Sequence, residues 1–252
     1  MTRPVPPLLP TSVLIMLRGL PVLLGASLLL LIGCGREFGP AGPERTETRD
    51  VELDNSEEVR AELRMGAGEL RVRGGARKLM EATFAYNRLR MRPEVSYHSG
   101  STGGFRGRLV VQEPHGISTG NNRYKWDLAF NDDKPLDLEV NCGAGESHLD
   151  LGDLSLRRVN VEMGVGELHL DLRGTPKNDY AVSIRGGVGE ATVYLPSGVG
   201  IEAEAKGGIG DIHTTGLEKR DGRYVNAALG HAKTTVRLDI QGGIGEIRLI
   251  AE

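Results

Sequence analysis

The feature that most constrains this sequence is a four-residue motif that occurs six times: glycine, a small apolar residue, glycine and an acid. From Gly143 the motif starts lie 21, 23 and 21 residues apart, and the last follows after 35. Repeats at such a period are typical of stacked architectures, because one unit cannot bury its apolar face alone. The glycines that we predict to form structural turns are Gly66, Gly68, Gly143, Gly145, Gly164, Gly166, Gly187, Gly189, Gly208, Gly210, Gly243 and Gly245.

Apolar residues alternate on both sides of each motif. In VNVEMGVGELHLDL, around Gly164, every second residue before and after the glycine pair is apolar. A period of two indicates strands with one buried face, so each motif predicts a strand, a tight turn and a second strand. With 36 glycines and only 4% aromatic residues, the composition also favours a turn-dense all-β protein. The predicted fold is a β-solenoid-like stack of short strands joined by Gly-x-Gly-Glu/Asp turns.

Two positions at the motif are expected to face the core. The residue between the glycines is Ala, Val or Ile and is predicted to plug the core at the corner, while the glycines permit the bend. The residue just before the motif has inward parity, so Cys142 is predicted to be a buried structural thiol. This column reads Met65, Cys142, Met163, Gly186, Gly207 and Gly242.

The motif acids have outward parity, and two interpretations are open. A stacked column of carboxylates is able to bind calcium, and the pattern is similar to GGxGxDxUx repeats, although here the acid comes one residue earlier. Alternatively, each acid accepts hydrogen bonds from the free amides of its turn, which we favour. The acids are Glu69, Glu146, Glu167, Glu190, Asp211 and Glu246.

Histidines follow two residues after three of these acids, at His148, His169 and His213. If neighbouring units stack, the first two would lie beside Glu146 and Glu167, in a set of ligand types that zinc prefers. Histidines on an exposed strand face are commoner than metal sites, and Thr192 interrupts the column. We therefore predict no metal and no cofactor, with Glu146, His148, Glu167 and His169 as the candidates should a metal bind.

The N-terminus carries a targeting signal. Arg18 precedes GLPVLLGASLLLLIGCG, an apolar run of suitable length for a signal-peptide core and short for a transmembrane helix. Its end, Leu31–Cys34, is similar to a bacterial lipobox, so Cys34 is the predicted lipidation site; the alternative is a plain anchor helix. Met16 is an alternative start. The residue after Cys34 is Gly35 rather than Asp, which favours the outer membrane in a bacterium with two membranes.

We predict four regions along the chain. Residues 1–33 form a lipoprotein signal peptide, and residues 34–50, which are charged and rich in Gly and Pro, form a flexible tether. Residues 51–142 form an N-terminal part and residues 143–252 the repeat stack. With Cys34 lipidated, Cys142 has no cysteine partner for a disulfide bond.

The segment from Arg77 to Phe130 departs from the repeat and is rich in basic and aromatic residues. Its aromatic residues either form the core of an N-terminal cap, which terminal units of a solenoid need, or belong to a patch that contacts anionic groups of an envelope. The cap is the favoured interpretation. If the protein binds a partner, this segment and the loop at Arg220–Tyr224 are the expected contact surfaces.

A longer stretch resembles a known family. LMEATFAYN, RPEVSY, LVVQEP and above all KWDLAFNDDKPLDLEVNCGAGE are similar to the bacterial toast-rack domain of LiaF-like cell-wall-antibiotic-response proteins and related adhesin-type proteins. The resemblance covers about Val51 to Gly174 closely and the later motifs more loosely. It implies a cell-envelope domain without known catalysis, some members of which restrain a sensor kinase. This chain departs from those members in having one lipobox and no multi-helix region.

The remaining signals bear on function. HExxH, GxSxG, P-loop and CxxC motifs are absent, and a net charge of -3 is too small to indicate nucleic-acid binding. The prediction is a non-catalytic, lipid-anchored scaffold or interaction module of the cell envelope, adhesin-like, whose partners are the membrane and an envelope protein or anionic glycopolymer. Two alternatives remain: an accessory sensor of envelope stress that acts on a membrane signalling partner, and a calcium-binding or polysaccharide-acting β-solenoid.

Overall fold

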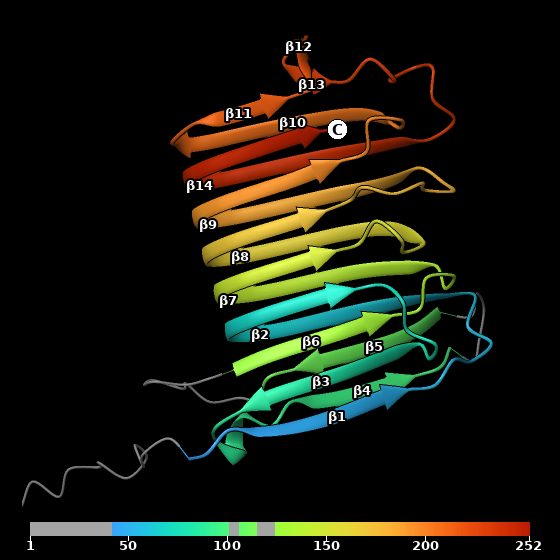
Figure 1. Cartoon of the computed structure of the whole chain (residues 1–252), viewed down its shortest axis with the longest axis vertical. Helices are drawn as coiled ribbons and strands as arrows, with labels where there is room; N and C mark the ends of the chain where they lie inside the picture. Colours follow the sequence, from blue (N-terminus) through green and yellow to red (C-terminus); the bar gives the residue numbers. More distant parts are fainter. Residues whose placement is uncertain (1–41, 101–105, 115–123) are drawn as a thin grey trace, which may run out of the picture. The chain divides into compact units, whose positions relative to one another are not determined.

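A computed structural model describes residues 42–100, 106–114 and 124–252, all within the unit Pro40–Glu252 (Figure 1). The predicted signal peptide, the lipidation site Cys34 and the first part of the predicted tether lie outside the described residues. In the part of the chain that the structure describes, no helix has the length and apolar character needed to span a bilayer.

The described residues form one 14-stranded sheet, which confirms the all-β prediction. Five strands are long: β2 (Glu58–Arg73), β7 (Leu136–Asp150), β8 (Leu156–Asp171), β9 (Tyr180–Leu195) and β14 (Thr235–Ala251). The others are β1 (Arg45–Val51), β3 (Met80–Tyr86), β4 (Glu94–His98), β5 (Arg106–Gln112), β6 (Tyr124–Phe130), β10 (Gly200–Ile209), β11 (Ile212–Thr215), β12 (Glu218–Arg220) and β13 (Arg223–Val225), with a 3-10 turn at Leu89–Met91.

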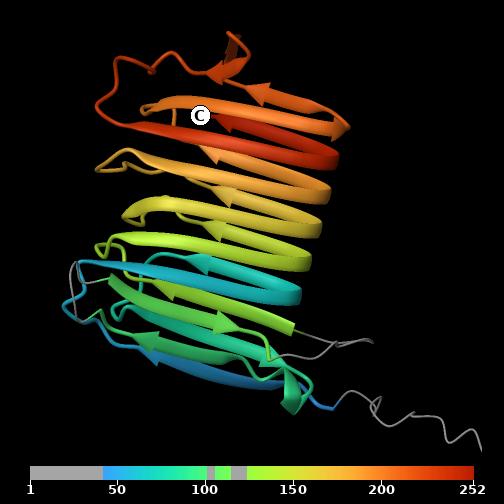
Figure 2. The same cartoon turned by 180° about the vertical axis from the view of Figure 1, so that it is seen from behind.

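Each long strand contains its motif near the middle and folds over there without ending, as Figures 1 and 2 show along one edge of the stack. Neighbouring strands stay paired through the bend, for example Ala144 with Val165 and Gly145 with Gly166. The second glycine of every motif has φ between 124° and 151°, a region that side chains rarely allow. The predicted strand, turn and strand are therefore one bent strand.

The bends divide the sheet into two layers around one core. The first halves of the long strands form the first layer and their second halves form the second layer, with parallel pairing throughout. The order of the rungs is β2, β7, β8, β9, β14 and β10, so the last strand of the chain lies between β9 and β10. The second layer of the final rung is β11, which pairs with β14.

The core follows the alternation in the sequence. Val159, Val161, Leu170 and their equivalents on β2, β7, β9 and β14 face inward and are buried, while Ala205 and Thr214 of the last rung are half-buried. Cys142 is 2% exposed, which confirms the predicted buried thiol, and burial raises its pKa. The rest of its column is not buried throughout, as it was predicted to be: Met65 is buried, Met163 and Gly242 are half-buried, and Gly186 and Gly207 are exposed, because glycine has no side chain to fill the position.

The N-terminal end closes the stack with five shorter strands. β6 pairs parallel with the second half of β2, and β3 and β1 follow it in antiparallel pairing. β5 pairs parallel with the first half of β2, and β4 follows it in antiparallel pairing, so these two extend the first layer. Trp126 is fully buried, with its ring 5.5 Å from those of Phe84 and Tyr124, so the cap interpretation of this segment is confirmed. Residues 45–50, predicted to be tether, instead form most of β1, because they pair in register with β3.

At the other end, the segment expected to be a loop contains the hairpin β12–β13. β13 pairs with β10 and so extends the first layer past the last rung. Asn226, which is buried, ties the chain after β13 to the start of β10. Its side-chain oxygen accepts a hydrogen bond from the Ile201 amide at 2.9 Å, and its side-chain nitrogen donates one to the Val199 carbonyl at 2.7 Å. The predicted contact residues Arg220–Tyr224 lie in this hairpin.

Candidate binding face and the bend edge

The residue between the motif glycines lies outside the core, so its prediction as a core plug is wrong. Val165, Val188, Ile209 and Ile244 are 55%, 47%, 70% and 51% exposed. The chain turns around this residue, which places its side chain on the convex side of the bend. The concave side is occupied by the residue before the motif, as the burial of Met65 shows.

The motif glycines are also required by the close approach of the rungs. A Cβ added at Gly166 would overlap the carbonyl oxygen of Gly145, and one at Gly143 would overlap that of Gly66. The same overlap recurs from rung to rung at Gly145, Gly189, Gly210 and Gly245. Glycine is therefore required at these positions both by the backbone conformation and by the close approach of the neighbouring strand.

The motif acids do not cap their turns, which corrects the favoured prediction. Glu69 accepts hydrogen bonds from Lys125 at 2.9 Å and Arg71 at 2.8 Å, and these lower its pKa, with the Lys125 bond as the main cause. Glu190 accepts from Arg248 at 3.0 Å. Among the described residues, no motif amide donates to a motif acid. Glu69, Glu190 and Glu246 pair with arginine or lysine side chains of the same face, and Glu146 and Glu167 lie near histidines.

The structure brings the four metal candidates side by side on the second layer. The rings of His148 and His169 stack with centroids 4.9 Å apart and an angle of 4° between their planes. Each Nε2 lies near the motif acid of its own strand, at 3.6 Å from Glu146 and 3.8 Å from Glu167. Parallel rings direct their nitrogens the same way and not toward one point, and the described residues contain no group of three or more ligand-type side chains arranged to hold a metal.

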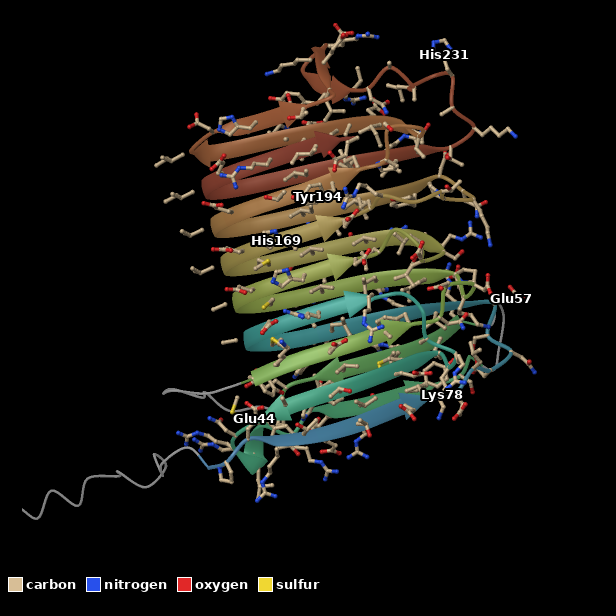
Figure 3. The ribbon with its side chains drawn as sticks, viewed as in Figure 1. Glu44, Glu57, Lys78, His169, Tyr194 and His231 are labelled. Carbon is tan, nitrogen blue, oxygen red and sulfur yellow. The ribbon has the colours of Figure 1, made fainter. Side chains whose placement is uncertain are left out.

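These histidines line a shallow groove of about 450 Å³ on the exposed face of the second layer. Figure 3 shows His169 and Tyr194 on this face. The groove collects guanidinium, imidazole, carboxylate and phenol groups from four neighbouring rungs. Its polar lining consists of Arg71, Arg73, His148, Asp150, His169, Asp171 and Tyr194.

Asp150 and Asp171 occupy equivalent positions on adjacent strands, and their environments differ. Burial, then the charges of Asp171 and Asp153, raise the pKa of Asp150. Burial also acts to raise the pKa of Asp171, but hydrogen bonds from Arg173, including one of 2.6 Å, outweigh it and lower the pKa. The Arg173 guanidinium lies 4.8 Å from the centre of the Tyr194 ring and holds that ring against the face.

Sequence analysis found the histidines of the groove and missed its other residues. A signal was present, since Glu-x-His-x-Asp occurs in two successive units, at Glu146–Asp150 and Glu167–Asp171. With a period of two, the histidine and the aspartate must share the outward face.

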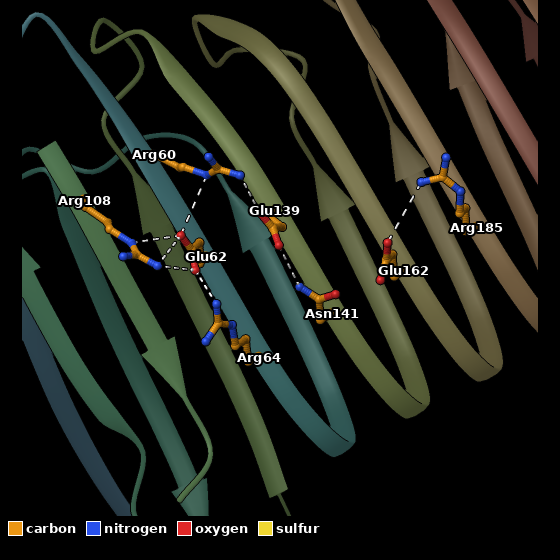
Figure 4. A network of polar contacts seen from close by, with 8 residues as sticks. All are labelled: Arg60, Glu62, Arg64, Arg108, Glu139, Asn141, Glu162 and Arg185. Atoms are coloured by element: carbon orange, nitrogen blue, oxygen red, sulfur yellow. Dashed lines mark hydrogen bonds and ion pairs between the residues drawn. The ribbon is translucent and has the colours of Figure 1, made fainter. Parts of the chain in front are cut away.

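On the exposed face of the first layer, more of the charged side chains form ion pairs than in the groove of the second layer. Glu62, 4% exposed, accepts from Arg108 at 2.9 Å and Arg64 at 2.5 Å and lies 3.7 Å from Arg60, as Figure 4 shows. Its pKa is lowered, chiefly by the Arg108 hydrogen bond. Five basic residues of the predicted contact segment are similarly paired with acids: Lys78 with Asp50, Arg92 with Glu47, Arg106 with Glu58, Arg108 with Glu62, and Lys125 with Glu69.

Comparison with known proteins agrees with this architecture. Residues 40–194 match a family model described as the N-terminal domain of toast_rack, and residues 144–249 match the C-terminal domain of the cell wall-active antibiotics response protein LiaF. A "putative cell adhesion protein" from Clostridium sporogenes is 31% identical, with a TM-score of 0.77, over 83% of this chain and 100% of that chain. A "putative adhesin" from Bacteroides fragilis matches at 10% identity and a TM-score of 0.27, over 81% and 97% of the two chains. No curated protein sequence gives a significant match.

Proposed function

The chain belongs to the toast-rack family and is a non-catalytic module associated with the cell envelope; from this premise we propose that it is lipid-anchored and adhesin-like, and holds a sugar polymer along the second-layer groove. One observation carries the proposal. The groove aligns hydrogen-bonding side chains in rows that repeat from rung to rung on a rigid surface.

The chemistry of the groove suits sugar hydroxyls. Arg71 and Arg73 donate hydrogen bonds, Asp150 and Asp171 accept them, and the imidazoles are able to do both. The ring of Tyr194 offers an apolar surface for the carbon face of a sugar ring. Rows about 4.8 Å apart on a rigid sheet present the same groups repeatedly, as a linear polymer of repeating units does.

Binding titrations test this function. The full chain in detergent is titrated with polygalacturonate as an anionic polymer and dextran as a neutral one. Replacing His148, His169 and Tyr194 together by Ala should weaken binding at least tenfold, since no contact row would remain in the centre of the groove. Asn160→Ala, on the other exposed face, is the matched control and should leave binding unchanged. If neither polymer binds, or if the groove variant binds like the control, the proposal fails.

The lipid anchor has its own test. Its support is the apolar run that ends at Cys34 and the short segment between this residue and β1. In cells given radiolabelled palmitate, the chain should incorporate label and fractionate with membranes. The variant Cys34→Ser should lose the label, and equal labelling of both chains would exclude anchoring at this residue.

The LiaF-like match favours a second candidate, an accessory sensor that acts on a membrane signalling partner. Under this function, deletion of the gene should change transcription in response to cell-wall antibiotics, and crosslinking in cells should capture a sensor kinase. An unchanged transcriptional response would contradict the sensor function and favour polymer binding.

A further inference from the structure

A column of aliphatic side chains follows the convex edge of the stack. In spatial order this column, here called the bend ridge, consists of Ala67, Ala144, Val165, Val188, Ile244 and Ile209. Of the six large apolar residues that are exposed in the described part of the chain, four belong to this ridge. Side chains of this kind, gathered on one edge, are typical of contact surfaces.

The backbone makes the ridge stand clear of its surroundings. A glycine precedes and follows every ridge residue, so no side chain shields it from either side along the strand. The bends of successive rungs align, as Figures 1 and 2 show, and so the ridge is continuous from β2 to β10. Its side chains enlarge in spatial order from Ala through Val to Ile.

The two rows next to the ridge carry different charges, and several of these side chains also pair within the chain: Glu69 with Lys125, Glu190 with Arg248, and Lys206 with Glu204. On the second-layer side lies the column of motif acids, with an acid on every rung. On the first-layer side, three residues before each ridge residue, cations outnumber acids. This flank consists of Arg64, Asn141, Glu162, Arg185, Gln241 and Lys206.

We propose that the bend ridge is the interface between two copies of this chain, packed ridge to ridge about a two-fold axis parallel to the stack. This rotation places the acid column of each copy opposite the first-layer flank of the other, where Arg185 and Lys206 lie. A two-fold axis perpendicular to the stack would instead set acids against acids, which costs free energy at close range. The acid column also disfavours the anionic surface of a membrane as the occupant.

The size of the edge sets the strength of this contact. Six rungs about 4.8 Å apart and two layers about 10 Å apart give an edge of roughly 300 Å² on each copy. The total, about 600 Å², is below the roughly 1,000 Å² of a specific interface, so chains that are free in solution are expected to stay monomeric. The dimer therefore rests on the lipid anchor of the proposed function, because confinement of both copies to one membrane raises their effective concentration.

Cysteine crosslinking of the full chain in its membrane tests the interface. Under a parallel two-fold axis, equivalent residues face each other on every rung, so Val165→Cys, Val188→Cys and Ile244→Cys should each form disulfide-linked dimers on mild oxidation. Lys177→Cys, in an exposed loop outside the ridge, is the control and should stay monomeric. The native Cys142 is buried, and the native Cys34 carries the lipid in the proposed function, so neither should contribute; dimers of the Lys177→Cys control would show that Cys34 is free. Crosslinking at only one ridge position, or at none, would overturn the proposal.

A second set of variants separates contact from folding. In a chain that carries Val165→Cys, adding Val188→Asp and Ile244→Asp should reduce crosslinking at least fivefold, while the melting temperature stays within about 2 °C because both side chains are exposed. Arg185→Glu with Lys206→Glu should reduce crosslinking similarly by setting acids against acids. Undiminished crosslinking in either variant would contradict the interface. Protection of Val188→Cys from a water-soluble maleimide by lipid vesicles, without dimers, would identify a membrane contact instead.

Discussion

The first three rungs and the last three use the same bend but place their bulk on opposite sides of it. In β2, β7 and β8 the concave side is filled by Met65, Cys142 and Met163, while the ridge outside carries Ala67, Ala144 and Val165. In β9, β14 and β10 the concave position is glycine and the ridge carries Val188, Ile244 and Ile209. Side-chain volume therefore moves from the inside of the bend to the outside along the stack.

This difference separates what the bend requires from what it tolerates. The glycines on either side of the ridge residue are present on every rung, since backbone atoms of the adjacent strand occupy the space of a Cβ. The position before the motif accepts Met, Cys or Gly. Where it is Gly, a small void of about 40 Å³ remains, lined by Gly186 and Gly242 among others. The rungs thus share the two glycines of the bend and differ in the side chain on its concave side.

Gly166→Val should have the largest effect, because it replaces a glycine that the bend requires on every rung. A side chain there would overlap the Gly145 carbonyl oxygen, and the φ of 141° is strained for valine. We expect a loss of about 4 kcal/mol or more in the free energy of unfolding, measured by urea denaturation. A loss under about 1 kcal/mol would show that the rungs are able to separate at the bend.

Met65→Ala should rank second, because it empties the concave side of a filled rung. Met65 is 3% exposed, and such a truncation costs about 2–3 kcal/mol. Val188→Ala, on the exposed ridge of a later rung, is the matched control and should cost less than about 0.5 kcal/mol in the monomer. Equal losses in the two variants would remove the distinction between inside and outside bulk.

The N-terminal end should add a pH dependence through Glu47. Hydrogen bonds from Arg92 first and Tyr86 next lower the pKa of Glu47 to about 2, from 4.5. Because the folded-state pKa is depressed, the stabilisation is present above pH 4.5 and is lost as the pH falls toward 2. Glu47→Gln should remove about 1 kcal/mol at pH 7 after solvent screening, and clearly less at pH 2, where about half of the Glu47 carboxyls are protonated in the folded state. A denaturation series from pH 7 to pH 2 checks this, and a loss that is constant with pH would assign it to packing.

Gly186→Ala should have the smallest effect, and a favourable one. A Cβ at this position meets no atom within 4 Å, and the backbone conformation there is open to any residue. Filling part of the void and restricting the unfolded chain should add about 0.5 kcal/mol to the free energy of unfolding. A melting-temperature measurement beside Gly166→Val compares two glycines of neighbouring rungs, and a destabilised Gly186→Ala would mean that the void is not free space.

The alternation of apolar residues was enough to predict the buried face of each strand and most of the core. A period of two assigns Val159 and Leu170 to a buried face whatever the path of the strand between them. It does not decide on which side of a bend a residue lies, because parity is lost where the chain turns back. Val165 was therefore placed inside when it lies outside.

Other features depended on contacts that are distant in sequence. Residues 45–50 resemble a tether by composition, yet β3 gives them a partner strand. The motif acids pair with cations such as Lys125, which comes 56 residues after Glu69. Only the histidines of the groove are predicted from the sequence. Asp150 and Tyr194 join them because their rungs are close in the stack, which the sequence does not show.

The position of β14 has a consequence for biosynthesis. This 17-residue strand follows every other described strand in the sequence, yet it pairs with β9 on one side and with β10 on the other. The rungs therefore cannot pair in the order in which they are synthesised, because β10 is made before the strand that joins it to β9. A chain cut before Thr235 should present unpaired edges at β9 and β10, which are open to pairing with other chains.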